Sequence, residues 1–172
     1  MINVIIKAGG YMKKVFKILA ILSLLIFTTA CDLSTEETFT EDNFKITLTD
    51  DFYKKDNLSS TYYYESTDVG IVATFEDFES LEEVNINSDS SLEDYLKVVE
   101  YANDEEYDSK KSENGKYYYF DYTASVSGKE FYYISAVYKG KTGFWLVTSY
   151  CENKNKDELK PVLLKYLNTV EV

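Results

Sequence analysis

The sequence predicts an α+β domain in which an antiparallel β-sheet, arranged as a meander, is sandwiched by two main helices. Alternating apolar residues joined by short Gly-containing links predict the strands, most clearly between 106 and 151. Two other segments, near 90–102 and 159–167, carry apolar residues at the spacing of one helix face. Two helices packed on an antiparallel sheet make an α+β sandwich of two or three layers.

The N-terminal segment has the order of a secretory signal. Residues 12–31 read MKKVFKILAILSLLIFTTAC: a basic start, an apolar stretch over 18–27, and three small residues before Cys31. The apolar stretch is too short to span a bilayer, so we expect 1–30 to be a signal peptide. Met12 is a possible true start, because the residues before it add nothing that a signal needs.

Cys31, which follows the small residues, resembles the cysteine of the lipobox of bacterial lipoproteins, although Thr28 stands where that motif prefers an aliphatic residue. The resemblance implies that Cys31 becomes diacylglycerol-modified and then the new N-terminus, and two acyl chains hold a protein stably on a membrane. We therefore expect an extracytoplasmic protein, lipid-anchored to the cell membrane, with a plain secreted protein as the alternative. Residues 31–43 are mostly polar and acidic, which predicts a flexible tether.

The folded domain is expected over 44–172, and its first half contains strands followed by one helix. The predicted elements are strands at 44–49, 61–64 and 70–75 and a helix at 90–102. Ser90 and Glu93 have the spacing of a capping box, which marks the start of this helix.

The second half is predicted as four consecutive antiparallel strands followed by a helix. The strands are 106–112, 116–126, 130–138 and 144–151. The links between them are Asn114-Gly115, which has the pattern of a type I′ turn, Ser127-Gly128 and the run KGKTG. In the final helix Pro161 fits only in the first turn, which places the helix start near Asp157 and Glu158.

Aromatic residues occur on both sides of these strands, so we expect the sheet to be covered on both sides, at least in part. The chain has 17 Tyr and 10 Phe, and Tyr is favoured at interfaces because it gives a large contact area with few torsions. Most of these rings are expected in the core, and others form a candidate interaction surface. The residues chosen for that surface are Tyr62, Tyr64, Tyr117, Tyr119 and Tyr133.

The charge of the chain excludes nucleic acid as a partner. Four of the 18 Lys precede Cys31 and none of the 30 acidic residues does, so the remainder carries 14 Lys against 30 acids, a net charge of −16. Phosphate backbones require clustered Lys and Arg, and this domain repels them. The excess of acid favours solubility, with a diffuse divalent-cation site as the alternative.

The residue patterns predict neither catalysis nor a cofactor. The chain has no His, so a Ser or Cys nucleophile lacks its usual base, and Cys151 is expected to be a buried thiol. Oxygen ligands for Ca²⁺ or Mn²⁺ are grouped at 50–51, 76–79 and 103–106, but without the spacing of a calcium loop. We therefore predict no catalytic residue, no metal site and no cofactor.

The order of these elements resembles the PsbP/DcrB-type domain of small bacterial lipoproteins. The segments that carry the resemblance are NFKITLTDDF, SLEDYLKVV, YYYFDYTASVSGKEFYYISAVY, GFWLVTSYC and LKPVLLKYLNTVEV, and it covers about 44–172. The resemblance implies an extracytoplasmic α+β sandwich that accompanies a larger membrane system; plant members dock on photosystem II and influence its manganese and calcium. No metal-binding motif of the family matches this chain, so no site residue carries over.

These observations favour a non-enzymatic binding or accessory lipoprotein that docks on an envelope protein through an acidic, Tyr-bearing face. The alternative is a lipoprotein that binds a small molecule or a divalent cation and serves a transporter, and a hydrolase ranks third. An exposed aromatic patch favours docking, and a deep pocket favours a small ligand. A Lys or carboxylate with a strongly shifted pKa in a cleft favours an enzyme.

Overall fold

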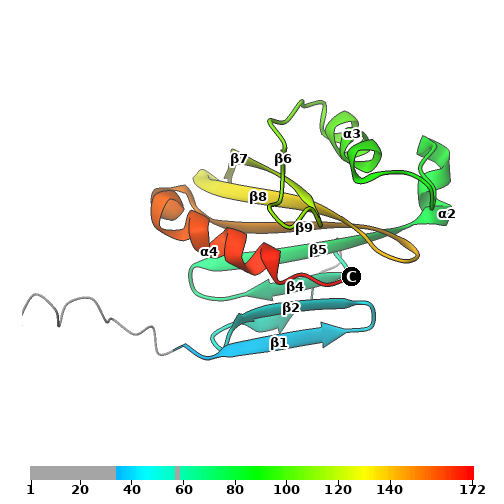
Figure 1. The fold of residues 1–172 in the computed structure, drawn as a ribbon. Coiled ribbons are helices and arrows are strands. Elements are labelled where there is room, and N and C mark those ends of the chain that lie inside the picture. Colours follow the sequence, from blue (N-terminus) through cyan, green and yellow to red (C-terminus); the bar gives the residue numbers. More distant parts are fainter. Residues whose placement is uncertain (1–33, 57–58) are drawn as a thin grey trace, which may run out of the picture. The chain divides into compact units, whose positions relative to one another are not determined.

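The computed structural model describes residues 34–56 and 59–172 and has the predicted α+β class. Seven antiparallel strands form one sheet in the order β3-β4-β5-β9-β8-β7-β6, and a separate hairpin pairs β1 with β2 (Figure 1). The strands are β1 Glu36–Glu41, β2 Phe44–Thr49, β3 Tyr53–Lys55, β4 Tyr62–Glu65, β5 Val69–Asp77, β6 Lys110–Lys111, β7 Tyr118–Val126, β8 Lys129–Lys139 and β9 Gly143–Glu152. The helices are α2 Phe78–Leu81, α3 Leu92–Asn103 and α4 Lys156–Asn168, with 3-10 turns η2 Glu82–Val84 and η3 Asn153–Asn155. The predicted signal peptide, Met12 and Cys31 lie outside the described residues.

Helices cover the sheet on both sides, at least in part, as predicted. α4 and the β1–β2 hairpin lie on one side, where Ile46, Trp145 and Leu163 belong to one buried core (Figure 1). α3 and α2 lie on the other side and bury a smaller cluster that includes Tyr95 and Phe144. Because side chains alternate along a strand, neighbouring residues of β9 contribute to opposite sides of the sheet.

Residues 36–41 form strand β1, which corrects the prediction that all of 31–43 is a flexible tether. All six residues of β1 pair with residues of β2. Phe39 is half-buried, and its ring centroid lies 4.9 Å from that of Tyr64. Backbone pairing does not depend on side-chain polarity, so together with one aromatic contact it orders a segment whose composition is polar.

The helix predicted at 90–102 is α3, but the predicted cap at Ser90 and Glu93 is wrong by one residue. Ser91 Oγ accepts a hydrogen bond from the backbone N–H of Asp94 at 3.1 Å, and the Asp94 carboxylate accepts one from the Ser91 N–H at 2.9 Å. Ser90 Oγ instead accepts from the N–H of Asn87 at 3.0 Å. The shorter Asp side chain thus completes a capping box in the place of Glu.

The type I′ turn predicted at Asn114-Gly115 is found instead at Ser127-Gly128, whose φ angles are 51° and 81°. At the earlier link Gly115 has a φ of 70°, and its N–H donates to the carbonyl of Ser112 at 2.9 Å. This wider turn leaves β6 with two residues in place of the strand predicted over 106–112. β7, β8 and β9 pair as consecutive antiparallel strands, as predicted.

α4 begins at Lys156, so Pro161 lies in its second turn and the prediction of a first-turn proline is wrong. Asp157 and Glu158 occupy the first turn, where they complement the positive end of the helix dipole as predicted. Proline has no N–H to donate to the carbonyl four residues earlier, which belongs to Asp157. Asp157 and Pro161 are both exposed, so water can hydrate the Asp157 carbonyl and a proline is tolerated in the second turn.

Two polar contacts fix α4 to the sheet. The buried Tyr138 hydroxyl donates to the carbonyl of Leu167 at 2.7 Å, near the C-terminus of the helix. Elsewhere Asp121 on β7 accepts hydrogen bonds from Tyr132 at 2.6 Å and from Lys160 at 2.9 Å. Burial raises the pKa of the Asp121 carboxyl, but these hydrogen bonds outweigh it and leave the pKa below its ordinary value.

We expect Tyr138→Phe to lower the free energy of unfolding by about 1 kcal/mol, because it removes one buried hydrogen bond without changing the packed ring. Denaturant unfolding followed by circular dichroism measures this change. Tyr119→Phe is the matched control, since Tyr119 is half-buried and none of the described residues forms a hydrogen bond with its hydroxyl. Equal effects of the two substitutions would contradict the role assigned to the Tyr138 hydroxyl.

We expect Asp121→Asn to destabilise the protein by about 1 kcal/mol at pH 7, a value discounted because Lys160 is partly exposed. The folded-state pKa of Asp121 lies below the unfolded value of about 3.9, so its contribution is present above that value and is lost as pH falls through the folded pKa. The difference between native and variant should therefore shrink below about pH 4. Denaturant unfolding at a series of pH values measures it, and a constant difference would be the contrary result.

Candidate functional site

An aromatic face lies on the α3 side of the sheet. It consists of Tyr63, Tyr122, Phe131, Tyr133 and Tyr150, all half-buried, from strands β4, β7, β8 and β9. Strand register places three of these rings in one row across the sheet, because Tyr122 pairs with Tyr133, and Tyr133 pairs with Tyr150. The ring centroids are 5.0 and 5.6 Å apart along this row, and Phe131 lies 6.0 Å from Tyr150.

The aromatic face is open because α3 and α2 cover the other end of the sheet. Phe144 and Val137, which pack in the cluster beneath these helices, are 0% exposed. Tyr63, Tyr133 and Tyr150 belong to neither buried cluster of the described chain. A hollow of about 220 Å³ at the edge of the face is partly lined by Tyr150.

A hydrogen-bond network fixes one edge of the aromatic face. The Tyr63 hydroxyl donates to Glu65 at 2.9 Å and lies 2.8 Å from the Tyr150 hydroxyl, while Lys55 forms an ion pair with Glu65. The hydrogen bond from Lys55 is the main cause that lowers the pKa of Glu65. Burial, followed by its two hydrogen bonds, raises the pKa of Tyr63, so its hydroxyl stays neutral. The edge rings are therefore held in place before any partner binds.

An acidic segment lies on the same side of the sheet as the aromatic face. Residues 76–108, which include α2 and α3, contain 13 acidic residues and one Lys, Lys97. The most exposed large apolar side chain of the described chain, Tyr101 at 88%, also lies on α3. This side of the molecule therefore combines half-exposed rings with a strongly negative charge.

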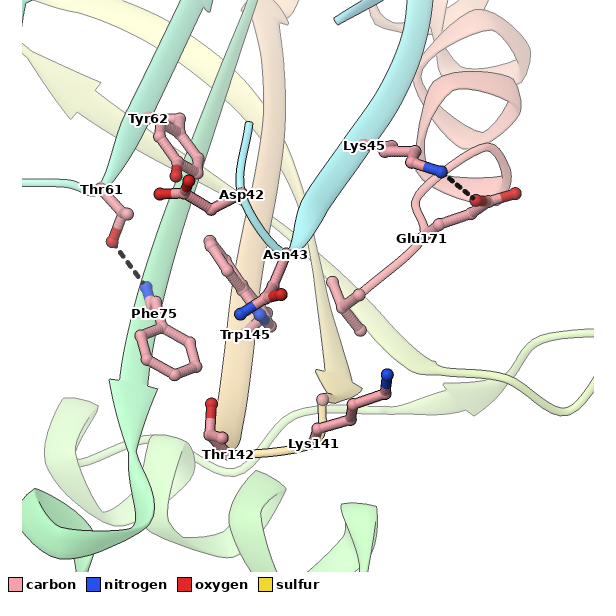
Figure 2. Close-up of a pocket in the computed structure, with 12 residues that line it drawn as sticks. Asp42, Asn43, Lys45, Thr61, Tyr62, Phe75, Lys141, Thr142, Trp145 and Glu171 are labelled. Atoms are coloured by element: carbon pink, nitrogen blue, oxygen red, sulfur yellow. Dashed lines mark hydrogen bonds and ion pairs between the residues drawn. The ribbon is translucent and has the colours of Figure 1, made fainter. Parts of the chain in front are cut away.

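A pocket of about 380 Å³ lies at the opposite end of the architecture, between the β1–β2 turn, the start of β4 and the β8–β9 turn (Figure 2). Tyr62, Phe75 and Trp145 form its aromatic wall. The rings of Tyr62 and Trp145 are stacked 5.9 Å apart at 16°, and Phe75 lies 4.9 Å from Trp145. Burial, followed by the nearby charge of Asp42, raises the pKa of Tyr62.

Polar side chains surround the mouth of this pocket. Asp42 and Asn43 come from the β1–β2 turn, and Lys141 and Thr142 from the β8–β9 turn (Figure 2). Lys45 forms an ion pair with Glu171 at 3.6 Å on one side of the pocket. The pocket thus has an apolar wall and a polar rim, which is the usual composition of a small-molecule site.

The structure distributes the five Tyr residues of the candidate interaction surface over four environments. Tyr64 and Tyr117 are buried in the core, at 0% and 5% exposure, where a partner cannot reach them. Tyr62 is in the pocket wall, and Tyr119 is half-buried on the α4 side. Tyr133 alone among the five lies in the aromatic face. Alternation along β4 and β7 sends neighbouring Tyr residues to opposite sides, and the sequence did not indicate which side is open.

The described residues show no arrangement typical of catalysis or of metal binding. Cys151 is buried, as predicted, and burial raises the pKa of its thiol. Hydrogen bonds to Tyr132 and Asp121 raise the pKa of Lys160, which is opposite to the shift of a lysine general base. Among residues 34–56 and 59–172, no three carboxylate or thiol groups are placed to share a metal ion. Within the same residues no helix is long and apolar enough to span a bilayer.

Comparison with known proteins shows that this chain is similar in fold to several solved structures. Neither a protein-family model nor a curated protein matches the sequence. The Ran-binding protein Mog1p of Saccharomyces cerevisiae is similar in structure, with a TM-score of 0.52 and 8% identity over 81% of this chain and 95% of that one. A Bacteroides thetaiotaomicron structure matches with a TM-score of 0.52 and 11% identity over 79% of this chain, which spans about half (48%) of that protein.

Cyanobacterial PsbP from Synechocystis is also similar, with a TM-score of 0.49 and 10% identity over 83% of this chain and 95% of that one. Sequence identities this low carry information about the fold and not about the activity. The chain therefore shares with solved proteins an α+β fold built on a large antiparallel sheet.

Proposed function

We propose that this protein is a non-enzymatic accessory domain, held outside the cell membrane by lipid on Cys31, that docks on an envelope protein through its aromatic face. The observation that carries the proposal is the row Tyr122, Tyr133 and Tyr150, whose rings contact one another while half-exposed. Contiguous apolar surface of this kind marks interaction sites on soluble domains.

The aromatic face suits a protein partner because its rings are large and already ordered. Tyr side chains bury much area at a small cost in torsional entropy. The contacts among Tyr63, Tyr150 and Glu65 reduce that cost further, because they restrict the rings before binding. The yeast protein Mog1p, which has a similar fold, is a Ran-binding protein, so protein docking is compatible with this architecture.

The acidic segment selects a basic partner. Residues 76–108 carry a net charge of −12 on the side of the aromatic face. Complementary charge accelerates encounter and rejects acidic surfaces. We therefore expect the docking surface of the partner to contain Lys and Arg around an apolar centre, and anionic lipid headgroups and nucleic acid to be repelled.

The second candidate function is the binding of a small molecule that the protein passes to a transporter. The pocket lined by Tyr62, Phe75 and Trp145 favours it, since its volume lies in the usual range for small ligands. The two functions use different surfaces and can be tested separately.

We expect a photo-crosslinking residue at Tyr133 to capture one envelope protein in living cells, because this position lies at the centre of the aromatic face. The same residue at Tyr119 is the matched control, since Tyr119 is also a half-buried tyrosine of the sheet but faces α4. Crosslinking at Tyr133 should fall when the ionic strength is raised during the assay of isolated membranes. Equal capture at both positions, or capture at neither, would contradict the docking proposal.

We expect Cys31→Ser to move the protein from the membrane fraction to the soluble extracytoplasmic fraction, because the substitution removes the sulfur that would carry the diacylglyceryl group as a thioether. Cell fractionation with immunodetection measures the distribution, and mass spectrometry of the native protein should show the mass of a diacylglyceryl group. Cys151→Ser serves as the control, since this thiol is buried in the domain. A Cys31→Ser form that stays on the membrane would refute the lipid anchor.

A further inference from the structure

We propose that the pocket beside Trp145 binds a neutral saccharide ring, either as a free sugar or as the end of a glycan chain. The proposal rests on the second function above, small-molecule binding, and names the class of ligand. It is independent of the aromatic face, which lies on the other side of the sheet.

The wall of the pocket consists of three aromatic rings, of which Tyr62 and Phe75 are half-buried and Trp145 is 4% exposed. Tyr62 and Trp145 are close to parallel, at 16°, and Phe75 extends the wall beyond Trp145 (Figure 2). A pyranose ring has one face made of C–H groups, which carry partial positive charge. Such a face packs well against the negative face of an aromatic ring.

The indole N–H of Trp145 is a hydrogen-bond donor that has no acceptor among the described residues. Trp145 is 4% exposed and lines the pocket. Among the hydrogen bonds formed by the described residues there is none from this N–H, and the nitrogen is not one of the fully buried polar atoms that lack a partner, so it is accessible from the pocket. Gly140 leaves the approach open, since a Cβ at that position would lie 3.5 Å from the indole nitrogen. A hydroxyl oxygen of a ligand on the wall would satisfy the donor.

The rim of the pocket matches hydroxyl groups. Asn43 and Thr142 offer donors and acceptors, and no described residue forms a hydrogen bond with either side chain. A sugar hydroxyl both donates and accepts, so a rim of mixed character can bind several of them.

The charges around the pocket favour a neutral ligand. Lys45 and Glu171 neutralise each other in an ion pair at 3.6 Å. Asp42 and Lys141, the remaining charged side chains of the lining, have opposite signs. An anionic or cationic ligand would meet one favourable and one unfavourable charge, whereas a neutral ring with hydroxyl groups can hydrogen-bond to both.

The intrinsic fluorescence of Trp145 provides a direct test, because it is the one tryptophan of the chain. The purified full-length protein is titrated with N-acetylglucosamine, with glucose and with a soluble oligosaccharide of N-acetylglucosamine. We expect a saturable change in fluorescence with at least one of them. A response to the free sugar indicates a monosaccharide ligand, whereas a response confined to the oligosaccharide indicates a glycan chain, and either supports the proposal.

The variant Asn43→Ala/Thr142→Val removes two rim groups and should weaken saccharide binding about tenfold. Its matched control is Asn153→Ala/Thr123→Val, which changes the same residue types away from the pocket. Circular dichroism verifies that both variants fold. Binding that is unchanged in the rim variant would place the sugar elsewhere and overturn the proposal.

A parallel titration with indole separates failure of the saccharide assignment from failure of small-molecule binding. Indole is neutral, planar and apolar. Because it absorbs at the same wavelengths as Trp145, its binding is measured by isothermal titration calorimetry and not by fluorescence. If indole binds saturably to the native protein and more weakly to a Trp145→Phe form while no saccharide binds, the pocket binds apolar rings and the saccharide proposal is wrong. If neither indole nor any of the saccharides binds, the second candidate function, small-molecule binding, is contradicted as well.

Discussion

The pairing of β5 with β9 joins the two halves of the sheet, and the other elements are arranged around it. Nine residue pairs, from Val69 opposite Cys151 to Asp77 opposite Gly143, connect segments that are far apart in the sequence. Gly143 permits the close approach at one end, because a Cβ there would lie 2.1 Å from the backbone oxygen of Glu76. Without this pairing, the sheet would be divided into β3 to β5 and the meander β6 to β9. Each part would then expose an edge strand with unpaired backbone N–H and C=O groups.

The central position of β9 explains why one side of the molecule is open. Its side chains alternate between the α4 side and the α3 side, so both faces need cover. α3 has 12 residues and is about 18 Å long, whereas the ten residues of β9 extend about 33 Å. α3 and α2 pack over Phe144 near one end of β9, whereas Tyr150 near the other end stays half-buried. The aromatic face is therefore the part of the sheet that these helices leave uncovered.

The pocket arises on the other side from the way the β1–β2 hairpin packs. Phe44 lies 4.9 Å from Trp145 and fixes the hairpin against the end of the sheet. Lys45 is joined to Glu171 by two backbone hydrogen bonds, at 2.9 and 3.0 Å, as well as by the ion pair. The turn between the two strands then projects Asp42 and Asn43 over the stacked rings. A hairpin whose first strand has the composition of a tether thus supplies three of the twelve residues that line the pocket.

The α+β class could be predicted from the sequence alone, together with the amphipathic helices and most strands, because the hydrophobic period and the turn residues act locally. The strong negative charge also follows from the sequence. The strand β1 could not be predicted in this way, because its order depends on tertiary contacts, namely the pairing with β2 and the contact of Phe39 with Tyr64. Tertiary packing also decided that Tyr64 is core and Tyr133 is half-exposed. A strand period separates two faces but does not state which of them another element will cover, and that depends on the lengths and positions of distant helices.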